Sequence, residues 1–202
     1  MNRSRFEDLL TDTKSSIDTK LKHIIVFEEI EFQNFSSISE EDSQQVLQWR
    51  NHPDIRYWMK RDDPISYEEH VKFLKKLQKD TKNYYFLAKI NDIPVGVSNL
   101  NGLDLVNKTV EMGLYLRPSN VISDAGFLIR QSTLQLAFEL MELNVLQVIV
   151  TQTNRPALLG HKFAGFKEDG RLRHNIIREN QPLDSFILSI LREEYNALRG
   201  SQ

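Results

Sequence analysis

The residues best suited to chemistry fall in three stretches, which run from Arg50 to Met59, from Glu111 to Phe127 and from Asn154 to Phe166. Each combines groups that donate or accept hydrogen bonds or protons with small or flat side chains. The sequence has no cysteine, which excludes disulfides, zinc–thiolate sites and a cysteine nucleophile. Its five histidines, at positions 23, 52, 70, 161 and 174, are too dispersed to predict a metal site.

The stretch from Asn154 to Phe166 predicts a short helix that follows a strand. Pro156 suits the first turn of this helix, and Gly165 suits its end. The helix presents one notable polar side chain, His161. Taken alone, the pattern is equally typical of an ordinary amphipathic helix closed by a glycine.

The stretch from Glu111 to Phe127 predicts a strand, a loop and the start of a long helix. A helix start suits anions, because its backbone N–H groups are free and the positive end of the helix dipole lies there. Ala125 and Gly126 are small enough to permit close approach to that backbone. Asp124 adds a negative charge at the same place, which opposes anion binding.

Length and composition predict one globular domain, since the chain has 202 residues, of which 40% are hydrophobic and 27% charged. A formal net charge of -2 gives no basic field that would favour a nucleic-acid partner. No apolar run approaches the roughly 20 residues that a membrane helix needs. The first residues carry acids and lack an apolar core, so we expect neither a membrane partner nor a secretory signal, and a cytoplasmic location.

Several elements must position these residues. Ser39 and Ser66 each stand three residues before an acid, which is the spacing of a helix N-terminal capping box. Alternating or continuous apolar runs predict strands, and longer periodic runs predict helices. We expect strands at 23–32, 84–88, 95–97, 109–116, 146–150 and 186–191, and helices after Ser39, after Ser66, from about Ala125 and from about Arg155.

This order predicts a mixed α/β fold over residues 23–202, with a central, twisted, mostly antiparallel sheet and helices on both faces. Residues 1–22 form an extension that is helical or disordered. The final strand is apolar, which leaves room for pairing with a second copy in a homodimer.

Together these motifs resemble the GNAT superfamily of acetyl-CoA-dependent N-acetyltransferases, in which an asparagine follows a strand and the next helix ends in Gly-Phe. The resemblance implies acetyl-CoA as co-substrate, with no metal. The phosphate-binding loop departs from the family pattern, because 117–126 is longer and contains one glycine. The residues that the resemblance assigns to acetyl-CoA are Leu114, Leu116, Arg117, Asp124, Ala125, Gly126, Phe127, Asn154 and Ala157.

The acceptor region is the more specific match. Residues 49–59, with Ile65-Ser66 and Glu69-His70, look like the corresponding region of bacterial nucleotide-sugar N-acetyltransferases, most of all those of the pseudaminic acid pathway. The segments 168–173 and 184–195 agree with that resemblance. It implies a nucleotide-linked amino sugar as acceptor, contacted by Arg50, His52, Trp58, Asn99 and Arg171. From the residues alone, Arg50 can equally pair with an acid at a helix end, and Trp58 can equally lie in the core.

The resemblance further implies direct attack of a neutral amine on the thioester in a ternary complex. Glu111 is the candidate base, although a solvated strand charge is the alternative. A backbone N–H near Leu116 would serve the developing oxyanion. His161 takes the place of a tyrosine that acts on the departing thiolate, either as a neutral imidazole that donates a hydrogen bond or as an imidazolium that donates a proton.

Two features keep other functions open. Ile149 stands where amino-sugar relatives can carry an acidic residue, and it cannot relay a proton. The atypical phosphate loop weakens the prediction of acetyl-CoA binding. The alternatives are an acetyltransferase of protein N-termini, of the ribosomal-protein type, and a non-catalytic GNAT domain that binds acyl-CoA.

Overall fold

The structure is a computed structural model, and it describes residues 14–21, 24–119 and 122–200. Of the extension predicted for residues 1–22, residues 14–21 form a helix that buries Ile17 and Leu21 in the main core. The first 13 residues of that extension lie outside the described part of the chain. No helix among the described residues is long and apolar enough to cross a membrane.

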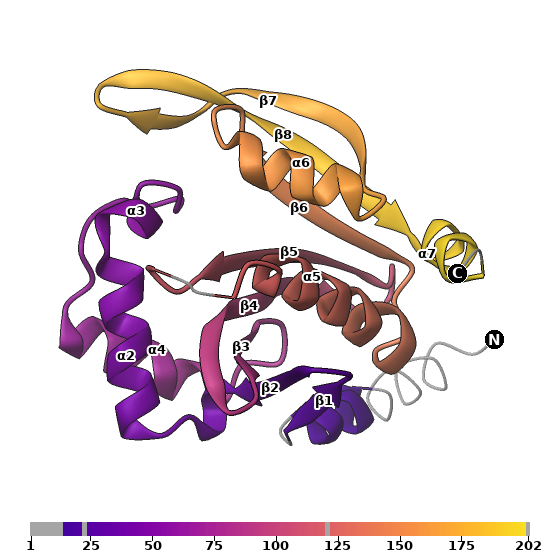
Figure 1. Ribbon diagram of the computed structural model, residues 1–202, viewed down its shortest axis with the longest axis horizontal. Coiled ribbons are helices and arrows are strands. Elements are labelled where there is room, and N and C mark those ends of the chain that lie inside the picture. Colours follow the sequence, from indigo (N-terminus) through magenta and orange to yellow (C-terminus); the bar gives the residue numbers. More distant parts are fainter. Residues whose placement is uncertain (1–13, 22–23, 120–121, 201–202) are drawn as a thin grey trace.

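One eight-stranded sheet runs through the molecule, in the order β1-β2-β3-β4-β5-β6-β8-β7 (Figure 1). Every neighbouring pair is antiparallel except β5 and β6, which are parallel. The prediction of a mixed, mostly antiparallel sheet is therefore confirmed. The strands are β1 (Ile25–Phe27), β2 (Ile30–Asn34), β3 (Tyr84–Ile90), β4 (Ile93–Asp104), β5 (Thr109–Leu116), β6 (Val145–Thr151), β7 (Lys167–Arg178) and β8 (Gln181–Leu191).

Helices cover both faces of this sheet, as predicted. On one face lie α5 (Ala125–Gln135), its π-helical continuation η2 (Leu136–Leu140) and α6 (Arg155–Phe163). On the other face lie α2 (Glu40–Asn51) and α4 (Tyr67–Leu77), which enclose a smaller core with Leu87 and Val97. The chain also contains the short helices η1 (Phe35–Ser37), α3 (Pro53–Arg56) and α7 (Arg192–Arg199).

The two helices that begin after serine are fixed by their caps. The Ser39 hydroxyl accepts from the Asp42 N–H, and the Ser66 hydroxyl accepts from the Glu69 N–H. The Ser66 N–H in turn donates to the Glu69 carboxylate at 2.9 Å, which completes a capping box. Such caps satisfy N–H groups that have no partner within the helix, so they fix where α2 and α4 begin.

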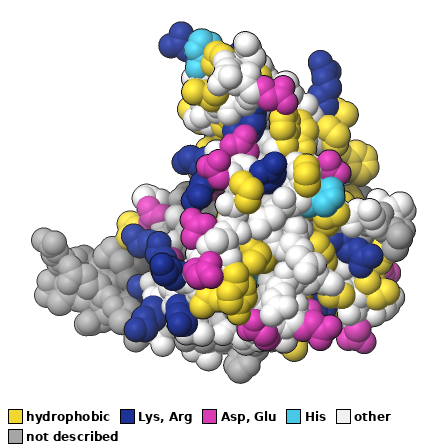
Figure 2. All heavy atoms as spheres, turned by 90° about the vertical axis from the view of Figure 1, so that its left-hand side faces the viewer, with side chains coloured by type: hydrophobic (Ala, Val, Ile, Leu, Met, Phe, Trp, Pro, Cys, Tyr) yellow, Lys and Arg dark blue, Asp and Glu magenta, His cyan; other side chains and the backbone are white. Residues whose placement is uncertain are grey.

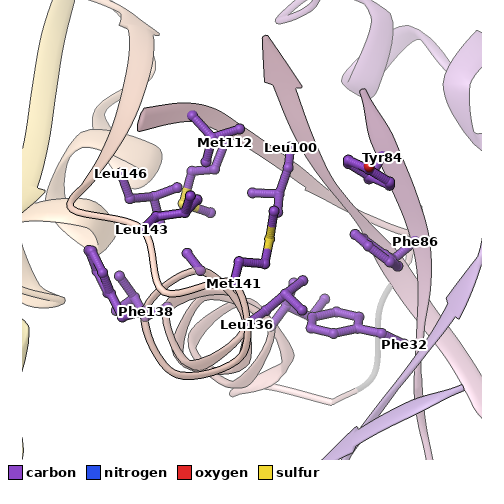
Figure 3. Close-up of a cluster of buried hydrophobic side chains, with 14 of the residues drawn as sticks. Phe32, Tyr84, Phe86, Leu100, Met112, Leu136, Phe138, Met141, Leu143 and Leu146 are labelled. Carbon is purple, nitrogen blue, oxygen red and sulfur yellow. The ribbon is translucent and has the colours of Figure 1, made fainter. Parts of the chain in front are cut away.

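The main core lies between the sheet and the α5–η2 helix. Figure 3 shows the side chains of β2 to β6 pointing toward those of η2 and the turn after it. Burying one large apolar side chain stabilises the fold by about 1.5–3 kcal/mol. The largest side chains that are fully buried here are Phe32, Phe86, Leu100, Met112, Leu136, Leu143 and Leu146.

Several elements differ from the sequence-based expectation, among them the short helices η1 and α3, which were not predicted. The single strand expected at 23–32 is a hairpin, β1 and β2, which turns at Glu28 with φ 51°. The edge strand β7 and the helix α7 were not predicted. β7 pairs only with β8, and its side chains are mostly exposed, so its sequence lacks the apolar alternation that predicts a strand.

The reason given above for dimer pairing is wrong. The apolar final strand, β8, is hydrogen-bonded on one side to β6 and on the other to β7. Its apolar residues 186–191 all pair with β6, and β7 pairs with the other edge as far as Ser189, so most of this strand's backbone is used within the chain. The edges of the sheet are β1 and β7.

Candidate functional site

The site is built around the point where two parallel strands separate. The pairing of β5 with β6 ends at Glu111 and Gln147. Beyond it, β5 continues to Leu116 beside β4, and β6 continues to Thr151 beside β8. The facing edges of β5 and β6 thus diverge in the middle of the sheet, and a molecule that lies between them can reach backbone groups that no strand partner occupies.

Glu111 is the last β5 residue before the strands diverge. It shares the α2 face of the sheet with Asn101 and Gln147, its partners on β4 and β6. Desolvation raises the pKa of Glu111, and the nearby charge of Lys60 lowers it in part. A carboxylate with a raised pKa at a strand opening is suited to accept a proton from a bound molecule.

Further polar groups lie on the same face of the sheet. Asn99 on β4 packs over Gly113, where a Cβ atom would come within 2.8 Å of the Asn99 Oδ1. Only glycine leaves room for this amide at that place. Tyr85 and Tyr115 stand on β3 and β5, and desolvation raises the pKa of both hydroxyls, so that both are neutral donors at ordinary pH.

Arg50, at the end of α2, extends over this polar face. Its Nη2 donates to the backbone carbonyl of Arg61 at 2.8 Å, and its Nη1 is buried with no hydrogen-bond partner among the described residues. Tyr85 and Tyr115 are close enough to affect the pKa of Arg50 electrostatically, although burial is the larger effect and lowers it. A half-buried guanidinium with an unused donor is suited to bind an oxygen of a ligand.

The other residues predicted to contact the acceptor have local partners. The ring of His52 caps α3, where its Nδ1 accepts from the Asp54 N–H at 3.3 Å. Trp58 is half-buried and packs edge-to-face on Tyr57, with 4.8 Å between the ring centroids. Arg171 lies on β7 and is paired with Asp184 of β8, so its charge is compensated within the hairpin.

The opposite face of the opening is formed by the start of α5. Asp124 precedes this helix without a side-chain capping bond, while its backbone carbonyl accepts from the Phe127 and Leu128 N–H groups at 2.9 Å. A Cβ atom on Gly126 would lie 3.5 Å from the Leu116 side chain, which shows how closely α5 approaches the end of β5. The start of α5 and the open edge of β5 are thereby neighbours, as the arrangement predicted for a phosphate site requires.

Two residues that were predicted to bind the co-substrate near the start of α5 contact other parts of the chain instead. Arg117 donates from its backbone to the Val95 carbonyl at 2.9 Å and from its side chain to the Pro94 carbonyl at 3.3 Å. It therefore holds the end of β5 to the start of β4. Phe127 is 42% exposed and packs edge-to-face on Phe163 of α6, with 6.1 Å between the ring centroids.

The start of α6 follows β6 directly. Asn154 is its N-cap, and the Asn154 Oδ1 accepts from the Ala157 N–H at 3.3 Å. The amide nitrogen of Asn154 is the part of this side chain that can donate to another molecule. Ala157 is half-buried against the main core, where a larger side chain would press on its neighbours.

His161 is buried in α6, with 3% of its surface exposed, and packs edge-to-face on Phe166. Burial and the charge of Arg130 lower the pKa of His161 to about 3. Of the two forms expected for this side chain, the structure therefore supports the neutral imidazole and not the imidazolium. Its Nδ1 is buried without a hydrogen-bond partner among the described residues.

Arg130, the cation beside His161, was not among the residues predicted from the sequence. It is 7% exposed, its Nη1 donates to the Gly126 carbonyl at 3.2 Å, and its Nε has no partner among the described residues. None of the ion pairs found in the described part of the chain includes Arg130. A Cβ atom on Gly160 would lie 2.7 Å from the Arg130 Nη2, so the guanidinium packs directly against the α6 backbone at this glycine. The signal in the sequence was an arginine among the inward-facing positions of the long helix.

The structure thus brings the predicted residues together as two groups. Arg50, Asn99 and Glu111 share the α2 face, and the α5 and α6 starts adjoin the opening from the other face. Within the described ranges, no three His, Asp or Glu side chains are grouped closely enough to hold a metal ion.

Comparison with known proteins identifies the family of this chain. The family described as Acetyltransferase (GNAT) domain matches residues 34–167. Acetyltransferase PseH of Campylobacter jejuni is 31% identical over 154 residues, which cover 75% of this chain and 95% of that protein. The crystal structure of the C. jejuni N-acetyltransferase PseH in complex with acetyl coenzyme A matches with a TM-score of 0.61 and 24% identity, over 80% of this chain and 98% of that chain.

A second solved structure shares the fold at lower identity. Spermidine N-acetyltransferase from Vibrio cholerae, in complex with CoA and spermine, matches with a TM-score of 0.77 and 16% identity, over 84% of this chain and 99% of that chain. The match to the family spans most of the region that contains the diverging strands and the α5 start. The chain therefore belongs to the GNAT acetyltransferase family.

Proposed function

We propose that this acetyltransferase moves the acetyl group of acetyl-CoA to the amine of a nucleotide-linked amino sugar, by direct attack in a ternary complex. The observation that carries the proposal is the opening between β5 and β6, with Glu111 on the α2 side and the start of α5 on the other. An opening with two accessible faces can bind two substrates at once. Such an arrangement favours direct transfer over a covalent enzyme intermediate.

The residues on the α5 side fit the co-substrate. The start of α5 has no side-chain cap, and Ala125 and Gly126 allow close approach of phosphate groups to its N–H groups. The uncompensated charge of Arg130 in the second turn adds to the attraction for an anion. Asn154 can donate its remaining amide hydrogens to a pantetheine carbonyl.

The residues on the α2 side favour an acceptor with anionic or hydroxyl oxygens. Arg50 has an unused donor there, and Lys60 acts electrostatically on Glu111. Tyr85 and Tyr115 add neutral hydroxyls, which suit a sugar. A polyamine acceptor would need a cluster of carboxylates instead, and Glu111 is the acid that the structure places at the end of the strand pairing.

Acetyl-CoA supplies the acetyl thioester when it is bound. Glu111 accepts the proton of the attacking amine, directly or through water, as the new N–C bond forms and the C–S bond breaks. A backbone N–H of β5, on the edge left open beyond Glu111, stabilises the negative charge on the carbonyl oxygen. The neutral imidazole of His161 is the candidate donor to the departing sulfur. Ile149, which is 39% exposed on β6, can contribute only apolar contact.

The proposal is tested by measuring CoA release from acetyl-CoA with a set of acceptors: UDP- and dTDP-linked amino sugars, spermidine and peptides with free N-termini. We expect turnover with one or more nucleotide-linked amino sugars, and none with a sugar that lacks the amine. Turnover with peptides or spermidine alone would reject the amino-sugar acceptor. Stabilisation by acetyl-CoA in a thermal melt, without turnover of any acceptor, would indicate a non-catalytic binder.

Arg50 gives a prediction about how the acceptor is held. Replacing Arg50 with methionine keeps the apolar stem and removes the donor, and should raise the KM for the nucleotide sugar about tenfold or more, because a hydrogen bond from a charged group is lost. The Kd for acetyl-CoA, measured by calorimetry, should change less than about twofold, since Arg50 lies on the other face. If both constants rise equally, Arg50 has a general structural role.

A further inference from the structure

The tip of the C-terminal β7–β8 hairpin contacts the segment that follows α3. Figure 1 shows the β7–β8 hairpin extending beyond the sheet, with its tip over α3. The hairpin turns at Glu179 and Asn180, which both have positive φ, as a two-residue turn requires. Most residues of β7 are exposed, whereas the last residue of the strand, Arg178, is buried.

Arg178 is 5% exposed and is bound by the segment that follows α3, which we call the 57–62 segment. Its Nε donates to the Tyr57 carbonyl at 2.6 Å, and its Nη2 donates to the Met59 carbonyl. Its Nη1 donates to the carbonyl of Ile177, and the Asp62 carboxylate lies 3.9 Å from its Nε. One guanidinium thus connects residues about 120 positions apart in the sequence.

The 57–62 segment is irregular, so its carbonyl groups have no helix or strand to satisfy them. A planar guanidinium donates to two carbonyl groups at angles that its rigid fork fixes. A lysine ammonium can also donate to two carbonyls, but its flexible stem does not fix their relative positions. Arg178 therefore fixes both the position and the direction of this segment. Figure 2 looks onto the side of the molecule that carries α2 to α4 and shows the hairpin tip projecting above them.

The same segment reaches the proposed acceptor side. Its Arg61 carbonyl accepts the Nη2 hydrogen bond of Arg50, and its Lys60 lowers the pKa of Glu111. It also carries Trp58, a candidate acceptor contact. Arg178 is thus connected to the proposed acceptor side through the carbonyl groups of the 57–62 segment.

We propose that Arg178 is a positioning residue that clamps the 57–62 segment over the acceptor side of the opening, so that the C-terminal hairpin helps to set acceptor affinity. Its effect on catalysis rests on the acceptor assignment proposed above, whereas the clamp itself does not. The acetyl-CoA side of the opening lies across the sheet and is not part of this connection.

The rate of trypsin cleavage tests the clamp without any acetyl-CoA or acceptor, because Lys60 and Arg61 are cleavage sites inside the clamped segment. Arg178→Met and Arg178→Lys should raise the rate of cleavage after Lys60 or Arg61 in the native protein, by about tenfold or more for Met and by less for Lys. Arg173→Met, on the exposed side of the same strand, should leave this rate unchanged. Circular-dichroism melts verify that each variant is folded at the assay temperature.

Steady-state kinetics measure the effect of the clamp on acceptor binding. Arg178→Met should raise the KM for the amino-sugar acceptor by about tenfold while the KM for acetyl-CoA changes less than about twofold, and Arg178→Lys should recover part of the loss. Faster cleavage with unchanged acceptor KM would overturn the positioning role, and unchanged cleavage would overturn the clamp. If the wild type acetylates no amino sugar, the proposed function fails, and the clamp still stands or falls on the cleavage rates.

Discussion

Replacing Glu111 with glutamine is expected to lower kcat/KM for the acceptor by about 10²- to 10⁴-fold, the range over which a positioned general base accelerates proton transfer. Glutamine keeps the size and the hydrogen-bonding oxygen of the side chain but cannot accept the amine proton. Because Glu111 faces the opening between β5 and β6, the change should leave the melting temperature nearly unaltered. Stopped assays of CoA release measure the rate.

The control is Glu31→Gln on β2, which is separated from β5 by β3 and β4. This variant loses the same charge from the same sheet and should keep wild-type activity. A loss of less than about threefold in Glu111→Gln would remove Glu111 as the base. Water would then have to carry the amine proton to another acceptor.

The pH dependence of the rate follows from the same carboxylate. Glu111 accepts a proton only when it is ionised, so kcat/KM should decline as pH falls toward its pKa, which desolvation raises above the ordinary value. Lys60 lowers that pKa by its charge, and Lys60→Met should therefore move the decline to higher pH. Added salt should narrow the difference between the two profiles, since the interaction is electrostatic. A shift to lower pH would contradict this assignment.

His161→Phe is expected to change how stability depends on pH. In the folded chain, burial and Arg130 lower the pKa of His161 to about 3, whereas an unfolded histidine titrates near its ordinary value. The unfolded state therefore binds a proton that the folded state does not, and the wild type loses stability as pH falls below about 6.5. At pH 5 this loss amounts to about 2 kcal/mol relative to pH 7.5.

Urea unfolding at pH 7.5 and pH 5 measures this contribution. Phenylalanine does not titrate, so the difference in unfolding free energy between His161→Phe and the wild type should move in favour of the variant by about 2 kcal/mol at pH 5. Ile190→Val, in the same core, should lower stability by about 1 kcal/mol at both pH values. Equal differences at the two pH values would show that His161 titrates alike in the folded and the unfolded chain, and so would contradict the lowered pKa.

The same variant tests the proposed role in catalysis. If the neutral imidazole donates to the departing sulfur, His161→Phe should lower kcat by about tenfold or more, with little change in the Kd for acetyl-CoA. A wild-type kcat in the variant would leave His161 with a purely structural role beside Phe166 and Arg130.

Local signals in the sequence determined much of the fold. The caps at Ser39 and Ser66, the apolar strands and the proline at the start of α6 each act on neighbouring residues, so their outcome is readable without tertiary contacts. The resemblance of three segments, at 49–59, 111–126 and 154–166, was enough to identify the GNAT family that the comparisons show. Strand β7 was not predicted from the sequence because its exposed residues show no apolar periodicity.

Other properties depended on groups that are distant in the sequence. Glu111 lies at the end of the β5–β6 pairing because two strands about 35 residues apart diverge there. His161 is neutral because packing buries its ring and, to a smaller extent, because Arg130 on another helix lies close to it. Arg178 reaches the 57–62 segment from the opposite end of the chain. The sequence by itself thus determined most of the elements, since these follow from local propensity and pattern, and its motifs determined the family by resemblance. Only the tertiary structure decided the protonation, partners and direction of the side chains, because burial and electrostatic contact arise when distant segments pack together.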